Sequence, residues 1–426
     1  MTDWKSRLNH MLICEAKYMK QRSIGKKGSY TVFLVMFLSG MILMTGAVIN
    51  AAHIKAIDSS CKDLGRVWAF SILGEYDRAL RDRYGLYGYY GNEDLVREKL
   101  ETYAGCSFKK KKYIKSGDFV CHMQDYKLMD LPAIKNQISH LILSFWRPVP
   151  FEGGSQETEA VEDGTAEESP ARYISAEWII EALPSHAYDG SSAGGSWLGG
   201  SVSEISYIFK AFKDHVDDRD LGKTYFDNEI EYIISGKLND EKSRKAVYDK
   251  LIIERNGMNL IYLYSCSEKR QAALEAAEII TPGPEALITQ AIILETWAFL
   301  EARNDLALLY DGQCVPVLKK DENWALGLDA AVDSEFGENE SGELDTRETK
   351  DYVRPRSIEG QNYGDYLKTL LAAVPENKRL LRIMDLIQIN MKYAYCDYFL
   401  MDDYYYGLKY EMTVNGRKYD FEERFS

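Results

Sequence analysis

The residues of this sequence that could do chemistry are mostly acidic. One run, Asp214-His215-x-Asp217-Asp218, places three carboxylates within five residues. Carboxylate oxygens at such spacing can hold a hard cation such as Ca²⁺. Acidic clusters without further support are, however, usually solvated faces. We therefore expect this cluster to lie at the surface, and we predict no metal site there.

Pairs of carboxylates are the second candidate, because glycosidases cleave with two acidic side chains. Glu229 and Glu231 lie two residues apart, so a helix would place them on different faces. A later predicted helix carries three acids, of which the last two share a face: Glu295, Glu301 and Asp305. A polar, solvent-facing side of each helix explains these acids more simply than a catalytic pair does.

Other signatures of catalysis are missing from the sequence. The six histidines show no metal-binding spacing, and the glycine pairs at 194–195 and 199–200 lack the Lys-Ser/Thr of a phosphate loop. The run Tyr404-Tyr405-Tyr406 could stack a ligand, but alternating burial in a strand explains it equally well. We predict no catalytic, cofactor-binding or metal-ligating residue and no cofactor, and we expect a protein that is not an enzyme.

The charge of the chain excludes some classes of partner. Its net charge is −14, and residues 1–29 contribute +5, with seven Lys/Arg against two acids, which leaves −19 for the remainder. So acidic a body argues against nucleic acid and against anionic lipid as partners. The 30 tyrosines are a weak indication of an interaction protein.

Seven cysteines are spread along the chain without a C-x-x-C pair. Cys106 and Cys121 flank a hairpin that we predict over residues 106–128, and a disulfide between them is one possibility. Buried or unpaired thiols are the other, because connectivity cannot be read from a sequence.

Residues 30–52 indicate on which side of a membrane the acidic residues and the cysteines lie. They contain no charged residue and no proline, and as a helix they would be about 34 Å long, enough to cross a bilayer core of roughly 30 Å. The basic residues 1–29 predict a cytoplasmic N-terminus, with the C-terminal domain outside the cell. A cleaved signal peptide is the alternative, but the run is longer than a signal core and no A-x-A site follows it. We therefore expect a single-pass anchor in the cell membrane.

Residues 53–91 are predicted as an amphipathic stalk that continues this helix to about Tyr84, because apolar residues recur at three- and four-residue steps from Ile54 to Leu80. The stripe should pack on the protein's own globular part, with self-assembly as the alternative. Residues 92–151 read as a small α/β unit. Its first helix opens at Asn92, and another begins at Pro132.

The rest of the chain alternates between acidic linkers and helical segments. We predict disorder in residues 152–172 and 333–350, which are acidic and poor in apolar residues. Residues 173–332 form a helical core of the ectodomain, with a short strand at residues 314–318. Residues 351–426 add further helices and a β-hairpin turning at Asn415-Gly416. The expected fold class is α+β and helix-dominated: a transmembrane helix continuing into a pilin-like stalk, then a mostly helical ectodomain with short antiparallel strands.

Several segments resemble a family of single-span membrane proteins of unknown function, found mainly in Gram-positive bacteria. The likeness begins with KGSYTVFLVMFLSGMILMTGAVINAAHIKAIDSS and SILGEYDRALRDRYGLYG, and it continues through EIEYIISG, RNGMNLIYLY and TWAFLEARNDLALLYDGQCVPVLK. Members of that family resemble the TadE/TadG-like pseudopilins of tight-adherence (Tad/Flp) pilus systems. The resemblance implies a hydrophobic N-terminal helix in the membrane and a globular head outside.

The resemblance also suggests a processing site. Prepilins are cut after a glycine and carry a glutamate five residues after it. Gly28-Ser29 is the matching pair here, but the fifth residue after Gly28 is Phe33. This departure fits an accessory component that keeps its anchor.

Our first expectation is therefore a structural or accessory part of a Tad/Flp-like pilus or secretion apparatus. Its expected partners are the lipid bilayer, other membrane proteins of that apparatus or further copies of itself through the N-terminal helix, and no nucleic acid. An extracytoplasmic module that binds a ligand or the cell wall is the alternative, and a cell-envelope enzyme is the second alternative.

Overall fold

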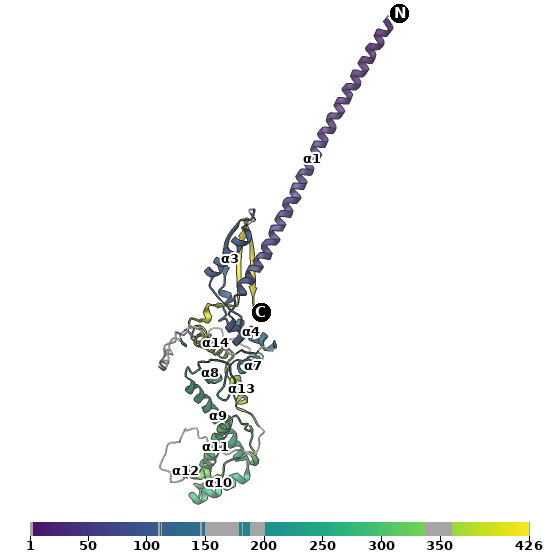
Figure 1. Cartoon of the computed structure of the whole chain (residues 1–426). Coiled ribbons are helices and arrows are strands. Elements are labelled where there is room, and N and C mark those ends of the chain that lie inside the picture. Colours follow the sequence, from purple (N-terminus) through teal and green to yellow (C-terminus); the bar gives the residue numbers. More distant parts are fainter. Residues whose placement is uncertain are drawn as a thin grey trace, which may run out of the picture. The chain divides into compact units, whose positions relative to one another are not determined.

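The computed structural model describes residues 3–109, 111, 113–144, 147–149, 179–180, 182–187, 201–336 and 360–425. The chain has the predicted helix-dominated α+β fold (Figure 1). The predicted linker at 152–172 and residues 337–350 of the second acidic stretch lie outside the described residues. The elements are α1 (Asp3–Leu73), α2 (Arg78–Tyr84), β1 (Tyr89–Tyr90), α3 (Glu93–Phe108), β2 (Ser116–His122), η1 (Gln124–Tyr126), α4 (Leu131–Leu143), α6 (Pro184–Ala187), α7 (Ser201–Ala211), α8 (Glu229–Ser235), α9 (Asp240–Ser265), α10 (Ser267–Ile280), α11 (Ala286–Tyr310), η2 (Asp321–Asn323), α12 (Leu328–Phe336), α13 (Tyr363–Ala373), α14 (Glu376–Ala394), η3 (Met401–Asp403), β3 (Tyr404–Tyr405), β4 (Gly407–Val414) and β5 (Arg417–Arg424).

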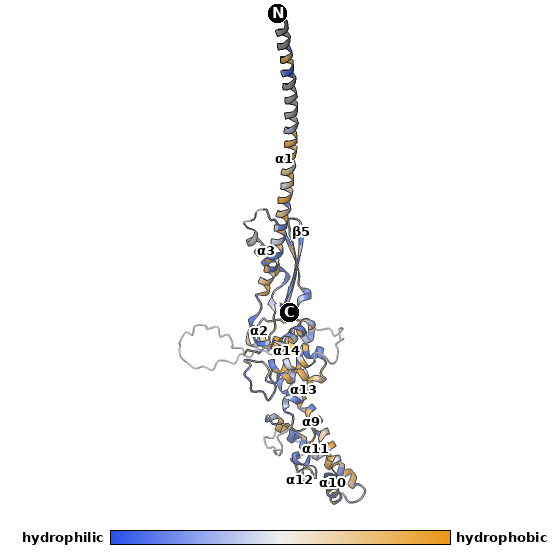
Figure 2. Ribbon diagram, turned by 90° about the vertical axis from the view of Figure 1, so that its right-hand side faces the viewer, coloured by the Kyte–Doolittle hydropathy of each residue, from blue (hydrophilic) through white to orange (hydrophobic). Residues whose placement is uncertain are grey.

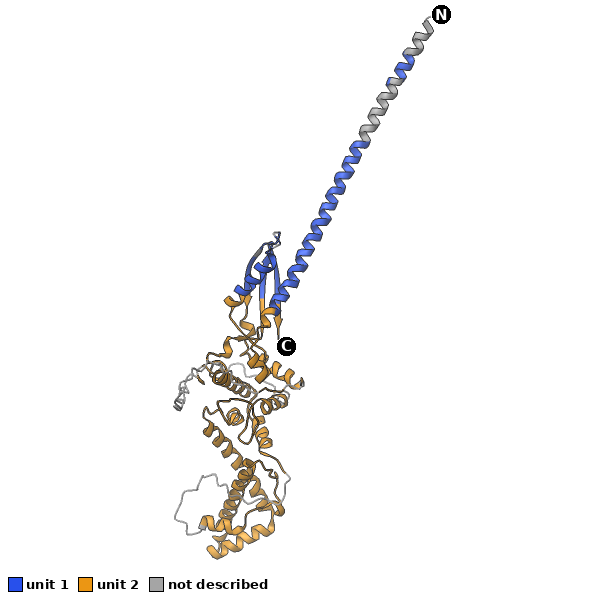
Figure 3. Cartoon of the chain, in the orientation of Figure 1, with its two compact units in different colours: residues 1–70, 97–120, 410–421 blue, residues 71–96, 121–409, 422–426 orange. Residues whose placement is uncertain are grey.

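The chain divides into two compact units, each assembled from segments far apart in the sequence (Figure 3). Unit 1 comprises residues 1–70, 97–120 and 410–421, and unit 2 comprises residues 71–96, 121–409 and 422–426. The β-strands form a two-stranded sheet of order β1-β3, which is antiparallel, and a three-stranded sheet of order β2-β4-β5.

Helix α1 contains a segment, Tyr30–Leu73, that is long and apolar enough to cross a membrane. Every side chain from residue 30 to residue 56 is exposed, and apolar residues follow one another along this part of the helix (Figure 2). Leu43, for example, is 75% exposed. So many large exposed apolar side chains on one helix are typical of a segment that lies in lipid or packs against other apolar surfaces.

The last part of α1 packs on the protein itself, as the first reading of the apolar stripe predicts. Cys61 and Trp68 are buried, and the Trp68 ring lies with its centroid 5.6 Å from that of Phe108 and 6.3 Å from that of Phe119. The predicted length is wrong, because α1 ends at Leu73 instead of near Tyr84. Asp77 starts a new helix by accepting a hydrogen bond from the backbone N–H of Leu80 at 3.0 Å, and this N-cap separates α2 from α1.

At Gly65, α1 lies in close contact with the C-terminal hairpin within unit 1. A Cβ atom added to Gly65 would lie 2.2 Å from the Phe421 ring. The hydroxyl of Tyr410 donates a hydrogen bond to the Gly65 carbonyl at 2.7 Å. Glycine is therefore required here by packing, although it lowers the intrinsic helix propensity.

Replacing Gly65 by alanine is expected to lower the free energy of unfolding by about 1–3 kcal/mol, because the new methyl group must displace a buried ring. Gly105 on α3 provides the control, since a Cβ there would meet nothing within 4 Å. Gly105→Ala should raise the same free energy by about 0.5–1 kcal/mol through helix propensity. Chemical denaturation of the two variants checks this, and equal effects of the same sign would contradict the packing role of Gly65.

Three local predictions in the chain need correction. The described residues between 106 and 128 form one strand, β2, and not two. Helix α3 continues to Phe108, because Val96, Leu100, Ala104 and Phe108 are buried at four-residue spacing. The strand predicted at residues 314–318 is a single bridge between Val315 and Gln361. Residues 333–336 of the second acidic stretch belong to α12.

The remaining long elements follow the sequence closely. Helices α7 to α11 occupy the range predicted to be helical, and α13 and α14 follow the second acidic stretch. The C-terminal hairpin turns at Asn415 and Gly416, whose φ angles of 49° and 77° suit this pair. Tyr404 and Tyr405 form strand β3 and are both buried, so their burial does not alternate.

Candidate functional site

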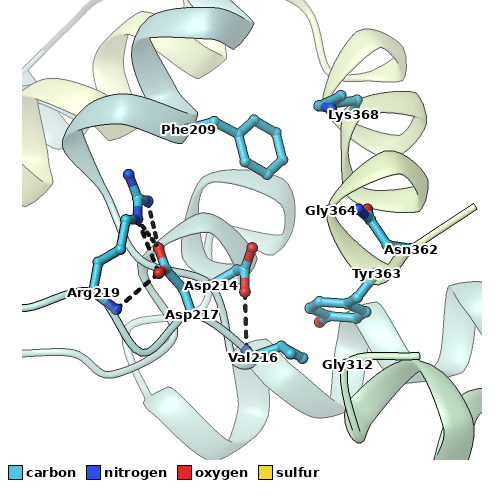
Figure 4. Close-up of a pocket in the computed structure, with 10 residues that line it drawn as sticks. All are labelled: Phe209, Asp214, Val216, Asp217, Arg219, Gly312, Asn362, Tyr363, Gly364 and Lys368. Atoms are coloured by element: carbon cyan, nitrogen blue, oxygen red, sulfur yellow. Dashed lines mark hydrogen bonds and ion pairs between the residues drawn. The ribbon is translucent and has the colours of Figure 1, made fainter. Parts of the chain in front are cut away.

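Unit 2 contains an open pocket of about 360 Å³ (Figure 4). One wall comes from α7 and the loop that follows it, a second from the start of α13, and Gly312 after α11 contributes to the floor. Its lining residues are Phe209, Asp214, Val216, Asp217, Arg219, Gly312, Asn362, Tyr363, Gly364 and Lys368. The volume is at the lower end of the range for small-molecule sites.

The loop after α7 owes its shape to its aspartates. Asp214 accepts a hydrogen bond from the backbone N–H of Val216 at 2.9 Å, and Asp217 accepts one from that of Arg219 at 3.0 Å. Asp220 closes a third turn of this kind with Gly222 at 2.9 Å. Aspartate favours such turns because its short side chain reaches the backbone two residues on. The acidic cluster singled out in the sequence is thus partly a turn-forming device.

The carboxylates of this loop lie in different electrostatic environments. Burial raises the pKa of Asp214 above its ordinary value. Asp217 is also partly buried, which works to raise its pKa, but hydrogen bonds from Arg219 hold that pKa below the ordinary value. The Arg219 Nε atom lies 2.9 Å from Oδ1 and 2.7 Å from Oδ2 of Asp217. Arg219 therefore neutralises the charge of Asp217, and Asp214 is the carboxylate of this loop that remains available to a ligand.

The opposite wall is the N-terminal half of α13, whose charges are also matched. Asn362 and Asp365 form a capping box, in which the Asn362 side chain accepts from the Asp365 N–H at 2.9 Å. Lys368 donates to the Asp365 carboxylate at 2.9 Å, and its Nζ atom lies 5.4 Å from the centroid of the Phe209 ring. This wall contributes aromatic and amide groups, with its helix terminus already capped.

Behind the pocket, Tyr363 connects the lining to a buried acid. Its hydroxyl donates to Oε1 of Glu231 at 2.7 Å, and the backbone N–H of His215 donates to the same oxygen at 3.0 Å. Burial raises the pKa of Glu231 to about 7, although these hydrogen bonds work to lower it. Glu229 is buried as well and accepts hydrogen bonds from the N–H of Lys213 and from the Asn390 amide. The expectation that these two acids face solvent is wrong.

Glu231 should make the stability of the protein depend on pH. Its carboxyl group keeps its proton up to about pH 7 in the folded chain, against an ordinary pKa of 4.5. Between these values the folded state binds more protons than the unfolded state, so the contribution of Glu231 to stability falls as the pH rises through this window. Glu231→Gln removes the titration while keeping a side-chain oxygen that accepts both hydrogen bonds.

We expect Glu231→Gln to raise the free energy of unfolding by about 3 kcal/mol at pH 8 and by little at pH 4.5. Urea denaturation of the wild type and the variant at both pH values measures this difference. A difference that is the same at pH 4.5 and pH 8 would contradict the burial-raised pKa.

A second buried ionic cluster lies between α9, α11 and the segment before η2. Arg255 donates to Oδ2 of Asp305 from Nε at 3.1 Å and from Nη2 at 2.8 Å, with both side chains fully buried. Lys319 forms ion pairs with Glu301 and Asp305. Glu301 and Asp305 share one helix face, as predicted, but that face is buried and ionic instead of solvated. Glu295 on the same helix is exposed and accepts from Asn256 at 2.8 Å.

The remaining candidates from the sequence do not line this pocket. Cys106 is exposed on α3 and Cys121 is buried in β2, and no disulfide joins them in this structure. Helix α1 runs without a break through Gly28 and Ser29. In the described part of the chain, no group of three His, Cys, Asp or Glu side chains is arranged to hold a metal ion.

A model of a family of unknown function (DUF5702) matches residues 167–416. No curated protein and no solved structure matches the chain. The matched range includes every residue of the pocket and of the buried ionic cluster, and it excludes the apolar segment of α1.

Proposed function

The chain belongs to this family of unknown function, DUF5702, and we propose that it is a single-pass membrane protein that serves as a non-enzymatic structural or accessory component of a Tad/Flp-like pilus or secretion apparatus. In this proposal the basic residues 1–29 stay in the cytoplasm and the acidic body lies outside the cell. Residues 30–52 remain in the membrane as an uncleaved anchor.

The observation that carries the proposal is the exposed apolar surface of α1. The side chains from residue 30 to residue 56 are all exposed in the chain on its own, and the most apolar window of the helix has 0% of its residues buried. A helix of this kind is stable only in lipid or against other apolar helices. Seven Lys/Arg before the segment support a cytoplasmic N-terminus. The resemblance to TadE/TadG-like proteins supports the kind of apparatus.

The non-enzymatic part of the proposal rests on the chemistry of the pocket. A pair of acids with separated pKa values is typical of acid–base catalysis. Here the acid with the lower pKa, Asp217, is held by hydrogen bonds from both the Nε and the Nη2 atoms of the Arg219 guanidinium. A carboxylate fixed in this way is a poor base or nucleophile, which favours binding over catalysis.

Affinity purification from membranes of the native host tests the proposal. The full chain carries a C-terminal tag, and the control chain has residues 30–52 replaced by an unrelated apolar span, which keeps the anchor but changes the helix surface. We expect Tad/Flp-type membrane subunits to be enriched with the full chain only. Purification of the full chain without such subunits, together with normal surface filaments in a deletion strain, would contradict it.

The pocket favours a second candidate function, an extracytoplasmic module that binds a small ligand or a group of the cell wall. Its single specific support is the available carboxylate of Asp214 in an open cavity. This function does not exclude the first, because an anchored accessory protein can also carry a binding site.

A further inference from the structure

Among the described residues, one carboxylate that lines the pocket forms no ion pair. Asp217 is paired with Arg219, and Lys368 is paired with Asp365. Among the described residues, no salt bridge involves Asp214, whose carboxylate accepts a hydrogen bond from the backbone N–H of Val216 at 2.9 Å. With these two pairs matched, Asp214 is the one charged lining residue that forms no ion pair among the described residues.

The surroundings of this carboxylate are apolar and aromatic. Figure 4 shows the Asp214 carboxylate directed into the cavity, between the ring of Phe209 and that of Tyr363, with Val216 below it. Tyr363 is 2% exposed and its hydroxyl donates to Glu231, so it adds a largely covered aromatic ring to this wall. An aliphatic chain bound in this pocket would therefore contact apolar side chains along its length and the Asp214 carboxylate at its end.

The start of α13 does not turn the pocket into an anion site. The positive end of a helix dipole attracts anions when its first N–H groups are free. Here the capping box satisfies the Asp365 N–H, and the Asp365 carboxylate already supplies a negative charge at this end. The same carboxylate neutralises Lys368.

We propose that this pocket binds a primary ammonium group at the end of an aliphatic chain, as in a lysine side chain, with Asp214 as its counter-ion. Phe209 and Val216 contact the methylene groups, and the ammonium group pairs with the Asp214 carboxylate. A cavity of about 360 Å³ holds one such chain and not a polymer. The ligand is therefore either a free amine or a single side chain presented by a larger molecule.

This inference rests on the second candidate function and gives it a ligand class. It is separate from membrane anchoring, so failure to bind amines would leave the anchoring proposal untouched. A ligand of other chemistry in the same pocket would overturn the inference and keep the second candidate function.

Calorimetric titration of the full chain in phosphatidylcholine nanodiscs tests it with three probes. The probes are L-lysine, Nα-acetyl-L-lysine amide, and Nα-acetyl-L-norleucine amide, which lacks only the ammonium group. We expect the acetylated lysine amide to bind at least about tenfold more tightly than the norleucine amide, because an ion pair in a partly buried site contributes more than 1 kcal/mol. Free lysine binding more tightly than the amide would identify a free amine as the preferred ligand. The reverse order would identify a presented side chain.

Two matched variants assign the binding to the pocket. Asp214→Asn should weaken the lysine amide by at least about tenfold. Asp218→Asn makes the same chemical change on an exposed residue that does not line the cavity, and it should change the Kd by less than about twofold. Phe209→Leu should weaken binding by about threefold, because it removes apolar contact area with the methylene groups. Unchanged thermal unfolding of each variant shows that the fold is intact.

Several outcomes would overturn the inference. They are equal binding of the lysine and norleucine amides, an Asp214→Asn variant with wild-type affinity, and no binding of any amine at about 10 mM. Ca²⁺ is the last probe, and it tests whether the pocket binds a metal ion instead of an amine. If Ca²⁺ raises the melting temperature, and if Asp214→Asn abolishes that effect while amines have none, the site binds a metal ion and the inference is wrong.

Discussion

Replacing Asp305 by alanine is expected to lower the free energy of unfolding by about 3–5 kcal/mol, because the Arg255 guanidinium would stay buried without its counter-ion. Asp305 and Arg255 are both 0% exposed. Oδ2 of Asp305 also accepts from the Asn259 amide at 3.1 Å, and Lys319 pairs with the same carboxylate. A single substitution therefore removes several interactions at once.

The cluster joins elements that are distant in the sequence. Arg255 on α9 donates to the carbonyls of Pro316 and Val317 and to the hydroxyl of Tyr366 on α13, at 3.0–3.1 Å. Glu301 on α11 accepts from the backbone N–H groups of Ala325 and Leu326. Loss of the acid at the centre should weaken the contacts of all these segments with one another.

Two further variants make this prediction specific. Asp402→Ala removes a pair with Lys127 whose acid is 52% exposed, and it should change stability by less than about 1 kcal/mol. The double variant Arg255→Met/Asp305→Leu removes both charges and should be more stable than Asp305→Ala, because no unpaired charge stays buried. Equal losses for Asp305→Ala and Asp402→Ala in urea denaturation would contradict the buried-ion account.

Two arginines in the apolar segment of α1 are expected to remove the protein from the membrane. Leu38→Arg/Ile42→Arg places two charges one helical turn apart near the middle of residues 30–52, where each costs about 2.5–3.5 kcal/mol of insertion free energy. The two substitutions together cost about 6 kcal/mol of insertion free energy. Arginine side chains that reach toward the membrane surface from the middle of the bilayer recover less than this amount. Both side chains are exposed in the chain alone, so the fold of the body should not change.

Carbonate extraction of membranes measures this effect as the ratio of pelleted to soluble protein. Ser59→Arg/Asp63→Arg introduces two arginines at the same spacing on the same helix beyond residues 30–52, and this variant should pellet like the wild type. If Leu38→Arg/Ile42→Arg also pellets like the wild type, residues 30–52 do not span a bilayer.

The sequence predicts the long elements well because they depend on local patterns. The apolar stripe of α1, the helices between α7 and α14 and the Asn415-Gly416 turn each leave a signature within a few residues. Boundaries fail where two signals compete. Asp77 caps a new helix although the apolar stripe continues to Leu80, and Lys109–Lys112 suggests an edge strand although buried residues at helical spacing continue to Phe108.

The pocket and the buried ionic cluster cannot be predicted from local sequence patterns. The pocket joins Phe209 and Lys368, which lie far apart in the chain, and nothing near either residue indicates the other. Asp305 looks like an exposed helix residue until Arg255 and Lys319 are known to face it. The Asp214–Asp218 run is the one sequence signal that leads to the pocket, and its meaning depends on Arg219 pairing with Asp217 and leaving Asp214 available.

Labelling of two native cysteines with a membrane-impermeant maleimide tests the central claim most directly. Cys14 and Cys106 are both exposed, and they lie on opposite sides of residues 30–52. Cys14→Ser and Cys106→Ser variants assign the signal to each thiol. A single-pass anchor with its N-terminus in the cytoplasm predicts that Cys106 reacts in intact cells and that Cys14 reacts only after lysis. Reaction of Cys14 in intact cells, or protection of Cys106 until lysis, would contradict the account.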